Sequence, residues 1–138
     1  MQKINHYRII WPQGLRRESL NISDCDQITD DAFIHMKKLR KLVMSHCSQP
    51  SISDSAFLHL GSLESLEMNF CSQRTISDKA FARLKGLRSL SMIACNQETI
   101  THDAFAHLKH LKSLDISYCN EKTISIRLLE HAYGLDEL

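Results

Sequence analysis

The stretch LESLEMNFCSQRTISDKAFARLKG, residues 63–86, recurs along the chain and decides its fold. LRKLVMSHCSQPSISDSAFLHLGS stands directly before it at residues 39–62, and LRSLSMIACNQETITHDAFAHLKH follows at residues 87–110. A further copy starts at Leu111 and drifts after LKSLDISYCNEKTIS, and an earlier copy, around Leu20, lacks two residues after its cysteine. A unit of 24 residues cannot bury its apolar side alone, so the copies are expected to stack as a solenoid.

The apolar spacing changes halfway through each unit. Leu66 and Met68 are two residues apart, which is the period of a strand, whereas Ala80, Phe81 and Leu84 follow helical spacing. The sequence therefore predicts about five units of strand, turn and short helix, with a parallel sheet inside and helices outside.

Polar residues mark both ends of the predicted helices. The Ser77 hydroxyl is expected to cap one helix, Thr29, Ser53 and Thr101 are expected to cap the others, and Asp78 adds a favourable charge. The helix dipole favours basic residues at the opposite ends, where we expect Lys37, Lys38, Arg83, Lys85, Lys109 and His110.

These units resemble the leucine-rich repeat family, whose pattern LxxLxLxx(N/C)xL is matched by LRKLVMSHC, LESLEMNFC, LRSLSMIAC and LKSLDISYC. The resemblance covers roughly residues 15–138. It implies an α/β solenoid, a right-handed βα superhelix with a curved parallel sheet on its concave face and short helices on its convex face. The cysteine followed by I(S/T)D is similar to the cysteine-containing repeats of F-box substrate receptors, although the 24-residue units and the short segment before residue 17 depart from them.

The two ends of the chain are expected to differ. We assign residues 1–16 to an N-terminal cap, because side chains such as Ile4 and Trp11 can cover the first core face of a solenoid. Residues 17–138 form the expected leucine-rich repeat domain, whose last unit is degenerate. The C-terminal LDEL keeps the register of a next unit, which leaves an open sheet edge or points to a longer parent chain. Because an open edge can pair with a second chain, a homodimer is one hypothesis.

Cysteines and histidines raise the question of metal binding. The cysteines fall at one equivalent position per unit, which predicts a structural ladder of buried thiols meeting backbone carbonyls: Cys25, Cys47, Cys71, Cys95 and Cys119. Glutamines two residues later are interpreted as a ladder on the turn surface: Gln27, Gln49, Gln73 and Gln97. A histidine column is expected on the outer helices, which lie too far apart for a shared metal shell: His35, His59, His107 and His131. We therefore predict no metal and no cofactor.

Composition narrows the function. The chain has 138 residues, with 17 basic and 16 acidic side chains, and this near-neutral balance argues against a dedicated nucleic-acid binder. It contains no apolar run long enough to span a membrane and no secretory signal at its start, so we expect an intracellular, cytoplasmic protein. Motifs such as HExxH, GxSxG and a Walker-type loop are missing from the sequence, which argues against an enzyme.

Partner recognition is expected on the concave face. In the leucine-rich repeat family, residues between and just after the inward strand positions point to that face, where partners commonly bind. Aromatic side chains beside charges there are typical of binding hot spots. The candidate partner-binding residues are Val43, His46, Glu67, Asn69, Phe70, Ile93, Asp115 and Tyr118. The resulting hypothesis is a non-catalytic protein-protein interaction module, and the alternative is the substrate-recognition part of an F-box-type ubiquitin-ligase receptor or larger assembly.

Overall fold

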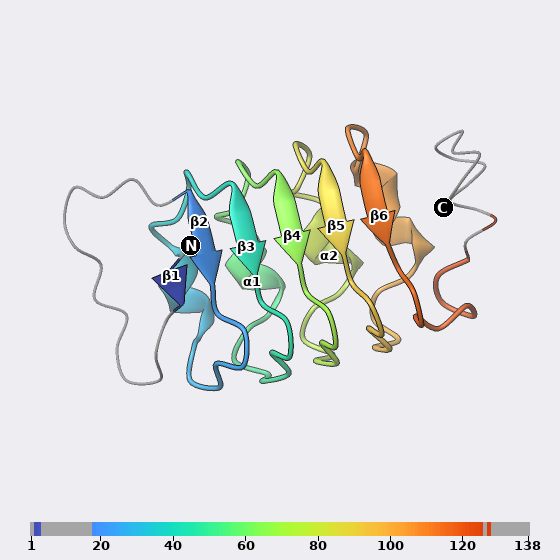
Figure 1. Cartoon of the computed structure of the whole chain (residues 1–138), viewed down its shortest axis with the longest axis horizontal. Helices are drawn as coiled ribbons and strands as arrows, with labels where there is room; N and C mark the ends of the chain where they lie inside the picture. Colours follow the sequence, from blue (N-terminus) through green and yellow to red (C-terminus); the bar gives the residue numbers. More distant parts are fainter. Residues whose placement is uncertain (1, 4–17, 126, 128–138) are drawn as a thin grey trace.

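A parallel sheet runs through the whole described part of the chain. The computed structural model describes residues 2–3, 18–125 and 127. Six strands lie side by side in chain order, as Figure 1 shows. Their bounds are β1 (Gln2–Lys3), β2 (Ser19–Asn21), β3 (Lys41–Val43), β4 (Ser65–Glu67), β5 (Ser89–Ser91) and β6 (Ser113–Asp115). Short helices lie behind the sheet, so each 24-residue unit contributes one strand to a solenoid.

The register of the sheet repeats without a slip. The central leucine of each strand lies opposite the central leucine of the next, as in Leu42 with Leu66 and Leu66 with Leu90. A shift of one residue would turn every one of these side chains to the other face, so burial of the leucines fixes the pairing. β1 extends the register at the N-terminal edge, where Gln2 pairs with Leu20. The other residues of the expected cap and the last unit beyond Arg127 lie outside the described residues.

The helices are short, with four residues in three of them and six in the last. They are η1 (Asp30–Phe33), α1 (Asp54–Phe57), α2 (Asp78–Phe81) and η2 (His102–His107). After Phe81 the chain returns to the sheet in successive three-residue turns, with the Leu84 N–H donating to Phe81 O at 3.0 Å and the Leu87 N–H to Leu84 O at 3.0 Å. These turns bring Leu84 and Leu87 into the core, where a continued helix would carry the chain away from the next strand.

Two expectations about the helices need correction. Ser53, Ser77 and Thr101 cap their helices through the side-chain oxygen, but Thr29 makes no such bond. All six basic residues assigned to helix C-termini instead lie beyond them, because η1 ends at Phe33, α2 at Phe81 and η2 at His107. A helix dipole acts only within the first and last turn, so it does not explain where these charges lie.

The core consists of columns that repeat with the unit. Phe33, Phe57, Phe81 and Phe105 are each no more than 1% exposed, and the rings of Phe81 and Phe105 lie 6.3 Å apart. The core also contains the inward strand residues, the residues after the strands, the cysteines and the turn isoleucines. Each side chain therefore packs mainly on its equivalents in the neighbouring units.

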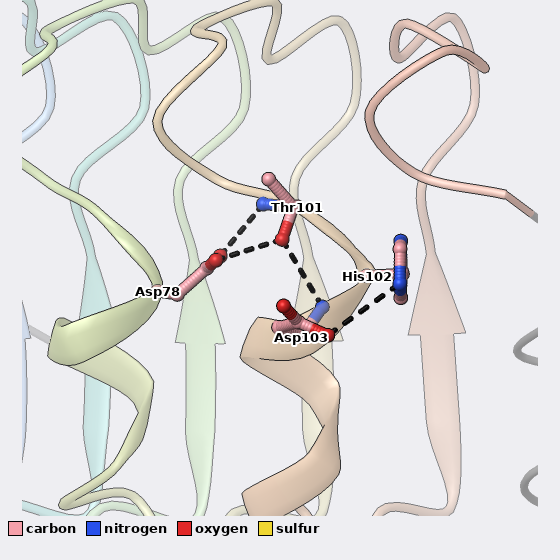
Figure 2. A network of polar contacts seen from close by, with 4 residues as sticks. All are labelled: Asp78, Thr101, His102 and Asp103. Carbon is pink, nitrogen blue, oxygen red and sulfur yellow. Dashed lines mark hydrogen bonds and ion pairs between the residues drawn. The ribbon is translucent and has the colours of Figure 1, made fainter.

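Hydrogen bonds from side chains also join successive units. Figure 2 shows Asp78 in α2 accepting from Thr101, the residue that caps η2, through the Thr101 backbone N–H at 2.6 Å and hydroxyl at 2.7 Å. Asp54 accepts from Ser77 and Asp30 from Ser53 through the same pair of atoms. We call these contacts the carboxylate ladder. From the sequence, Asp78 was expected only to favour the helix dipole, and the ladder was not predicted.

The carboxylate ladder stops at the last described unit. His102 occupies the position of Asp30, Asp54 and Asp78, and its side chain contacts Asp103 at 3.4 Å instead, as Figure 2 also shows. A second set of bonds changes at the same unit. The hydroxyls of Ser51, Thr75 and Thr99 donate to an isoleucine carbonyl of the preceding unit, whereas the Thr123 hydroxyl donates to Asn120 O within its own unit.

Within the described residues, no helix has the length and apolar character needed to cross a membrane.

Candidate functional site

The solvent-facing side of β2–β6, which we call the sheet face, carries most of the candidate binding residues. The first and third residues of each strand point to it, as Ser65 and Glu67 do beside the buried Leu66. The ladder of backbone bonds continues past the strand ends, with the Met68 N–H donating to Ser91 O at 2.8 Å and the Phe70 N–H to Ile93 O at 2.8 Å. Residues after the strands therefore extend the same rigid surface.

Val43, one of the candidate partner-binding residues, is buried in the structure. Its side chain is only 7% exposed, and Ser45 next to it is 8% exposed. The register places Val43 between Asn21 and Glu67, so a short branched side chain in this column has a longer neighbour on each side. Val43 stabilises the sheet face from within and offers little area to a partner.

Glu67 and Asn69 belong to a hydrogen-bond network inside the sheet face. Asn69 Oδ1 accepts from the Ser91 hydroxyl at 2.7 Å and from the Ile93 N–H at 2.8 Å. Glu67 Oε1 accepts from the Ser45 hydroxyl and from Asn69 Nδ2, both at 3.3 Å. The two side chains are half-buried and hold three units together. Their polar groups therefore serve the fold, a role that the sequence reading did not anticipate.

Asp115 has a comparable local contact on β6. Its Oδ1 accepts from the Ser117 hydroxyl at 2.6 Å and from the Ser117 N–H at 3.0 Å. Both bonds lower the pKa of the Asp115 carboxyl below its ordinary value, because they favour the charged form, and the bond from the Ser117 hydroxyl has the larger effect. A pocket of about 320 Å³ opens next to this carboxylate at the C-terminal end of the sheet. Its lining includes Asp115, Ser117, Tyr118, Cys119 and Glu121.

The residue before each cysteine has a left-handed backbone conformation. The φ angles lie between 55° and 61° at Asp24, His46, Phe70, Ala94 and Tyr118. Only glycine adopts this region freely, and a bulky side chain there is uncommon because its Cβ approaches the backbone. The sequence gives a weak signal at Asp24 and His46, whose types tolerate the conformation, and none at Phe70 or Tyr118. At each of these positions the chain leaves the strand and turns toward the buried cysteine.

Aromatic side chains project from these left-handed positions. The rings of His46 and Phe70 stack with centroids 4.7 Å apart and planes 8° apart. Phe70 is 50% exposed and Tyr118 is 85% exposed. Ile93, on the strand side of the same region, is half-buried. We call His46, Phe70, Ile93 and Tyr118 the aromatic surface.

The cysteines form a ladder behind the turns. None of the five is in a disulfide, and four of them donate from Sγ to a carbonyl of the preceding unit. These bonds are Cys47 to Ile22 O at 3.0 Å, Cys71 to Met44 O at 3.1 Å, Cys95 to Met68 O at 2.8 Å and Cys119 to Met92 O at 2.9 Å. Burial raises the pKa of Cys47 to about 11 and the pKa values of Cys71 and Cys95 to about 12. Because the thiolate is the reactive form, these cysteines are structural and unreactive near neutral pH.

The glutamine column differs from its interpretation as a turn-surface ladder. Gln73 and Gln97 are each only 4% exposed, whereas Gln27 is exposed. The side-chain amide atoms of Gln73 and Gln97 have no hydrogen-bond partner within the described part of the protein. Gln49 is half-buried, so the exposed fraction of the column falls from Gln27 toward the middle of the solenoid.

Histidines of the outer column lie on the convex side. His35 and His107 are exposed and His59 is half-buried, while His131 lies outside the described residues. Across residues 2–3, 18–125 and 127, no three side chains of the metal-ligating types gather closely enough to hold an ion.

These features define the class of the protein. A parallel sheet with one strand per 24-residue unit, an inward leucine on every repeat strand and short helices behind it is a leucine-rich repeat solenoid, a fold typical of non-catalytic interaction modules. The chain belongs to the BspA-type leucine-rich repeat family, since the model of the BspA type leucine rich repeat region matches residues 13–133 in six copies. The expected fold class is confirmed. The F-box-like subtype is not confirmed by this match.

Solved structures share the fold. The chain is similar to TLR13 in its complex with ssRNA13, with 28% identity and a TM-score of 0.60 over 72% of this chain. It spans 14% of the TLR13 chain. It is also similar to human 5T4, also called Wnt-activated inhibitory factor 1 or trophoblast glycoprotein, with 20% identity and a TM-score of 0.53 over 83% of this chain and 57% of that one. No curated protein sequence matches the chain.

Proposed function

We propose that this chain is a protein-binding module that holds its partner on the sheet face through the aromatic surface. The observation that carries the proposal is the pair of exposed aromatic rings, Phe70 and Tyr118, held at left-handed turn positions of a regular sheet. Aromatic side chains are enriched among the few residues that dominate the binding energy of protein interfaces.

Rigidity supports the same function. The backbone N–H of Phe70 is hydrogen-bonded to the next unit, and the Phe70 ring is stacked on His46. A partner therefore meets side chains that are already ordered, so less conformational entropy is lost on binding. Phe70 and Tyr118 are two units apart, which corresponds to about 10 Å at the usual spacing of strands.

Charge favours a protein over a nucleic acid on this face. The sheet face and its turn positions carry the carboxylates of Asp24, Glu67 and Asp115 against the single ammonium group of Lys41 among the described residues. A negative surface repels phosphate groups. The TLR13 structure is a complex with ssRNA13; for this chain we propose a protein partner, with a basic or hydroxyl-bearing side chain next to Asp115 and an apolar group on Phe70 or Tyr118.

A comparison of matched variants tests the proposal. The double variant Phe70→Asn, Tyr118→Asn removes both rings while keeping residues that tolerate the left-handed conformation, and Ala94→Asn makes the same change where no ring is lost. Proteins captured from lysate by the wild-type chain should be lost by the double variant and retained by Ala94→Asn, with circular dichroism confirming that all three fold. The proposal fails if the double variant captures the same proteins as the wild type.

The cysteine ladder keeps a second candidate function open. Cysteine at the ninth position followed by I(S/T)D is the feature that this chain shares with F-box substrate receptors. On this reading the module selects substrates for a ubiquitin ligase, directly or within a longer chain. Co-purification of an F-box adaptor with the module would support it, and partners that bring no ligase component would contradict it.

Two further expectations stay proposals. An intracellular location suits five cysteines without a disulfide, because an oxidising compartment favours disulfides. A homodimer through the C-terminal sheet edge would double the mass in solution, which light scattering after gel filtration measures directly.

A further inference from the structure

The net charge of +1 conceals a separation of charge between the two edges of the solenoid. The strand-start edge comprises Glu18 and the segments that lead from each helix to the next strand, residues 34–41, 58–65, 82–89 and 106–113; it is the upper edge in Figure 1. It carries nine basic and two acidic side chains. The strand-end edge comprises residues 24–31, 46–55, 70–79, 94–103 and 118–125, and carries three basic and nine acidic side chains.

All the basic residues of the strand-start edge are exposed. They are Lys37, Lys38, Arg40, Lys41, Arg83, Lys85, Arg88, Lys109 and Lys112. The acidic residues of this edge are Glu18 and Glu64, and Glu64 lies 3.8 Å from Arg40. Among the described residues only Arg40 of this set has an acidic partner. The positive charges lie in three of the four segments, because residues 58–65 carry no lysine or arginine. The groups on either side of that segment are two units apart, about 10 Å at the usual spacing of strands.

The edge is also hollowed. A depression of about 560 Å³ is lined by Glu18, Lys38, Arg40, Gly61, Ser62, Glu64, Gly86 and Arg88. At Gly61 the missing side chain leaves open space, since a Cβ atom there would meet nothing within 4 Å, whereas a Cβ atom at Gly86 would lie 3.9 Å from Leu63 O. The depression is thus lined by three basic and two acidic side chains around small residues that an extended segment can approach closely.

Apolar groups adjoin the basic residues. Ile34 is 40% exposed and Leu58 is 52% exposed, and they occupy equivalent positions at the ends of η1 and α1, which pack against each other. The corresponding residues of the next two units are Ala82 and Ala106. Two neighbouring aliphatic side chains beside a positive edge suit a ligand that is both acidic and apolar.

We infer that the strand-start edge is a second docking surface, which binds an acidic segment of a partner protein that also carries an aliphatic side chain. Carboxylates of the segment pair with Lys38 and Arg88 across the hollow, and its aliphatic side chain packs on Ile34 and Leu58. A nucleic acid fits less well, because phosphates gain nothing from the exposed aliphatic side chains of Ile34 and Leu58. None of the residues proposed to hold the segment belongs to the aromatic surface, so the inference does not depend on the proposed function.

Fluorescence anisotropy with defined probes tests this inference. A labelled peptide of repeating Glu-Glu-Leu should bind the wild-type chain, and its affinity should fall as salt is added. Peptides of repeating Gln-Gln-Leu and Glu-Glu-Ser, which lack the charge or the aliphatic group, should bind more weakly. An oligothymidylate is the competing polyanion, and its tighter binding would overturn the inference, as would the absence of any binding by the Glu-Glu-Leu peptide.

Variants locate the site on the molecule. Lys38→Glu, Arg88→Glu should weaken binding of the Glu-Glu-Leu peptide about tenfold or more, because like charges then face each other. The matched control Lys79→Glu, Lys122→Glu reverses two exposed charges on the strand-end edge and should leave the affinity unchanged. Equal loss in both double variants would mean that only total charge matters, which would contradict the inference.

One variant separates the apolar contact from the charges. Leu58→Ser should weaken binding of the Glu-Glu-Leu peptide about fivefold, as expected for one lost aliphatic contact, and leave the Glu-Glu-Ser peptide unaffected. An unchanged affinity for the Glu-Glu-Leu peptide would disprove the aliphatic contact. The sheet-face variant Phe70→Asn, Tyr118→Asn should bind the peptide like the wild type, so failure of the proposed function and failure of this inference can be distinguished.

Discussion

Asp78 and Thr101 are 23 residues apart in the sequence, yet the Asp78 carboxylate accepts both the backbone N–H and the hydroxyl of Thr101, at 2.6 Å and 2.7 Å. Thr101 in turn accepts the Asp103 N–H at 3.2 Å and caps η2. A single carboxylate therefore joins two units and orders the start of the second helix. The carboxylate ladder is the clearest case in which a side chain couples local structure to the stacking of the units.

Removal of a ladder carboxylate should destabilise the protein. Asp78→Ala leaves the Thr101 N–H and hydroxyl without their charged acceptor, so we expect the free energy of unfolding to fall by about 2 kcal/mol. Chemical denaturation followed by circular dichroism measures the change. Asp31→Ala, at an exposed position in the first turn of η1, is the control and should change the stability by less than about 0.5 kcal/mol. Similar effects of the two substitutions would argue against the ladder.

Extension of the ladder should stabilise the protein. His102 lies where Asp78 lies one unit earlier, and its N–H donates to Thr123 O at 3.0 Å just as the Asp78 N–H donates to Thr99 O at 3.2 Å. His102→Asp therefore places a carboxylate to accept from Ser125, and we expect a gain of about 1 kcal/mol. The midpoint of urea unfolding should rise for His102→Asp and stay unchanged for His102→Asn. The dependence of the unfolding free energy on urea concentration should be the same in both variants and the wild type. A lower midpoint for the aspartate would contradict this account.

The buried thiols predict a dependence of stability on pH. The pKa of Cys71 is raised from an ordinary 9.0 to about 12 by burial, so the folded state holds its proton more tightly than the unfolded state. This contribution is fully present below pH 9 and is lost as the pH rises toward 12. Unfolding at a series of pH values should show this loss. Cys71→Ser, which keeps a donor to Met44 O but does not titrate, should lessen the slope; an unchanged slope would exclude the thiol as its source.

The left-handed positions predict an unusual effect of glycine. Ala94 has a φ of 55°, where the Cβ costs about 1 to 2 kcal/mol, so Ala94→Gly relieves more strain than it adds unfolded-state entropy. We expect a gain of about 0.5 kcal/mol. Ala94→Val should lose about 1 kcal/mol or more, because a branched side chain fits this region worst. Denaturation of the two variants beside the wild type gives both values, and a stabilising valine would refute the strain argument.

The residues explain why the fold was easier to predict than the candidate site. Strands and helices have characteristic residue spacings, which the sequence shows locally at Leu66 and Met68 and at the repeated Phe81 position. The elements and their stacking could therefore be predicted from the sequence. Side-chain contacts between neighbouring units depend on distances in space, which the spacing of residues in the sequence does not give. The Asn69 network, the Asp78 contact with Thr101 and the burial of Val43 therefore appeared only in the structure.

Two other features could not be predicted, namely the left-handed backbone at Phe70 and the separation of charge between the two edges. A left-handed backbone at Phe70 contradicts what phenylalanine prefers, and only the tight turn into the buried Cys71 imposes it. The net charge is near zero because the positive charge of one edge and the negative charge of the other nearly cancel. The near-neutral total argues against nucleic-acid binding at the sheet face. It does not describe the strand-start edge, where Lys38 and Arg88 are among the residues that line an open hollow.

The separated charges give the described part of the molecule a permanent electric dipole moment that lies along the strands. A charged partner is rotated by such a field before contact, so its first encounter is biased toward one edge and the rate of association rises above that of an unoriented collision. The same asymmetry lets a nearly neutral protein adhere to both cation and anion exchangers at low salt. In a crowded cell, neighbours of opposite sign would therefore approach this molecule from opposite ends of its strands.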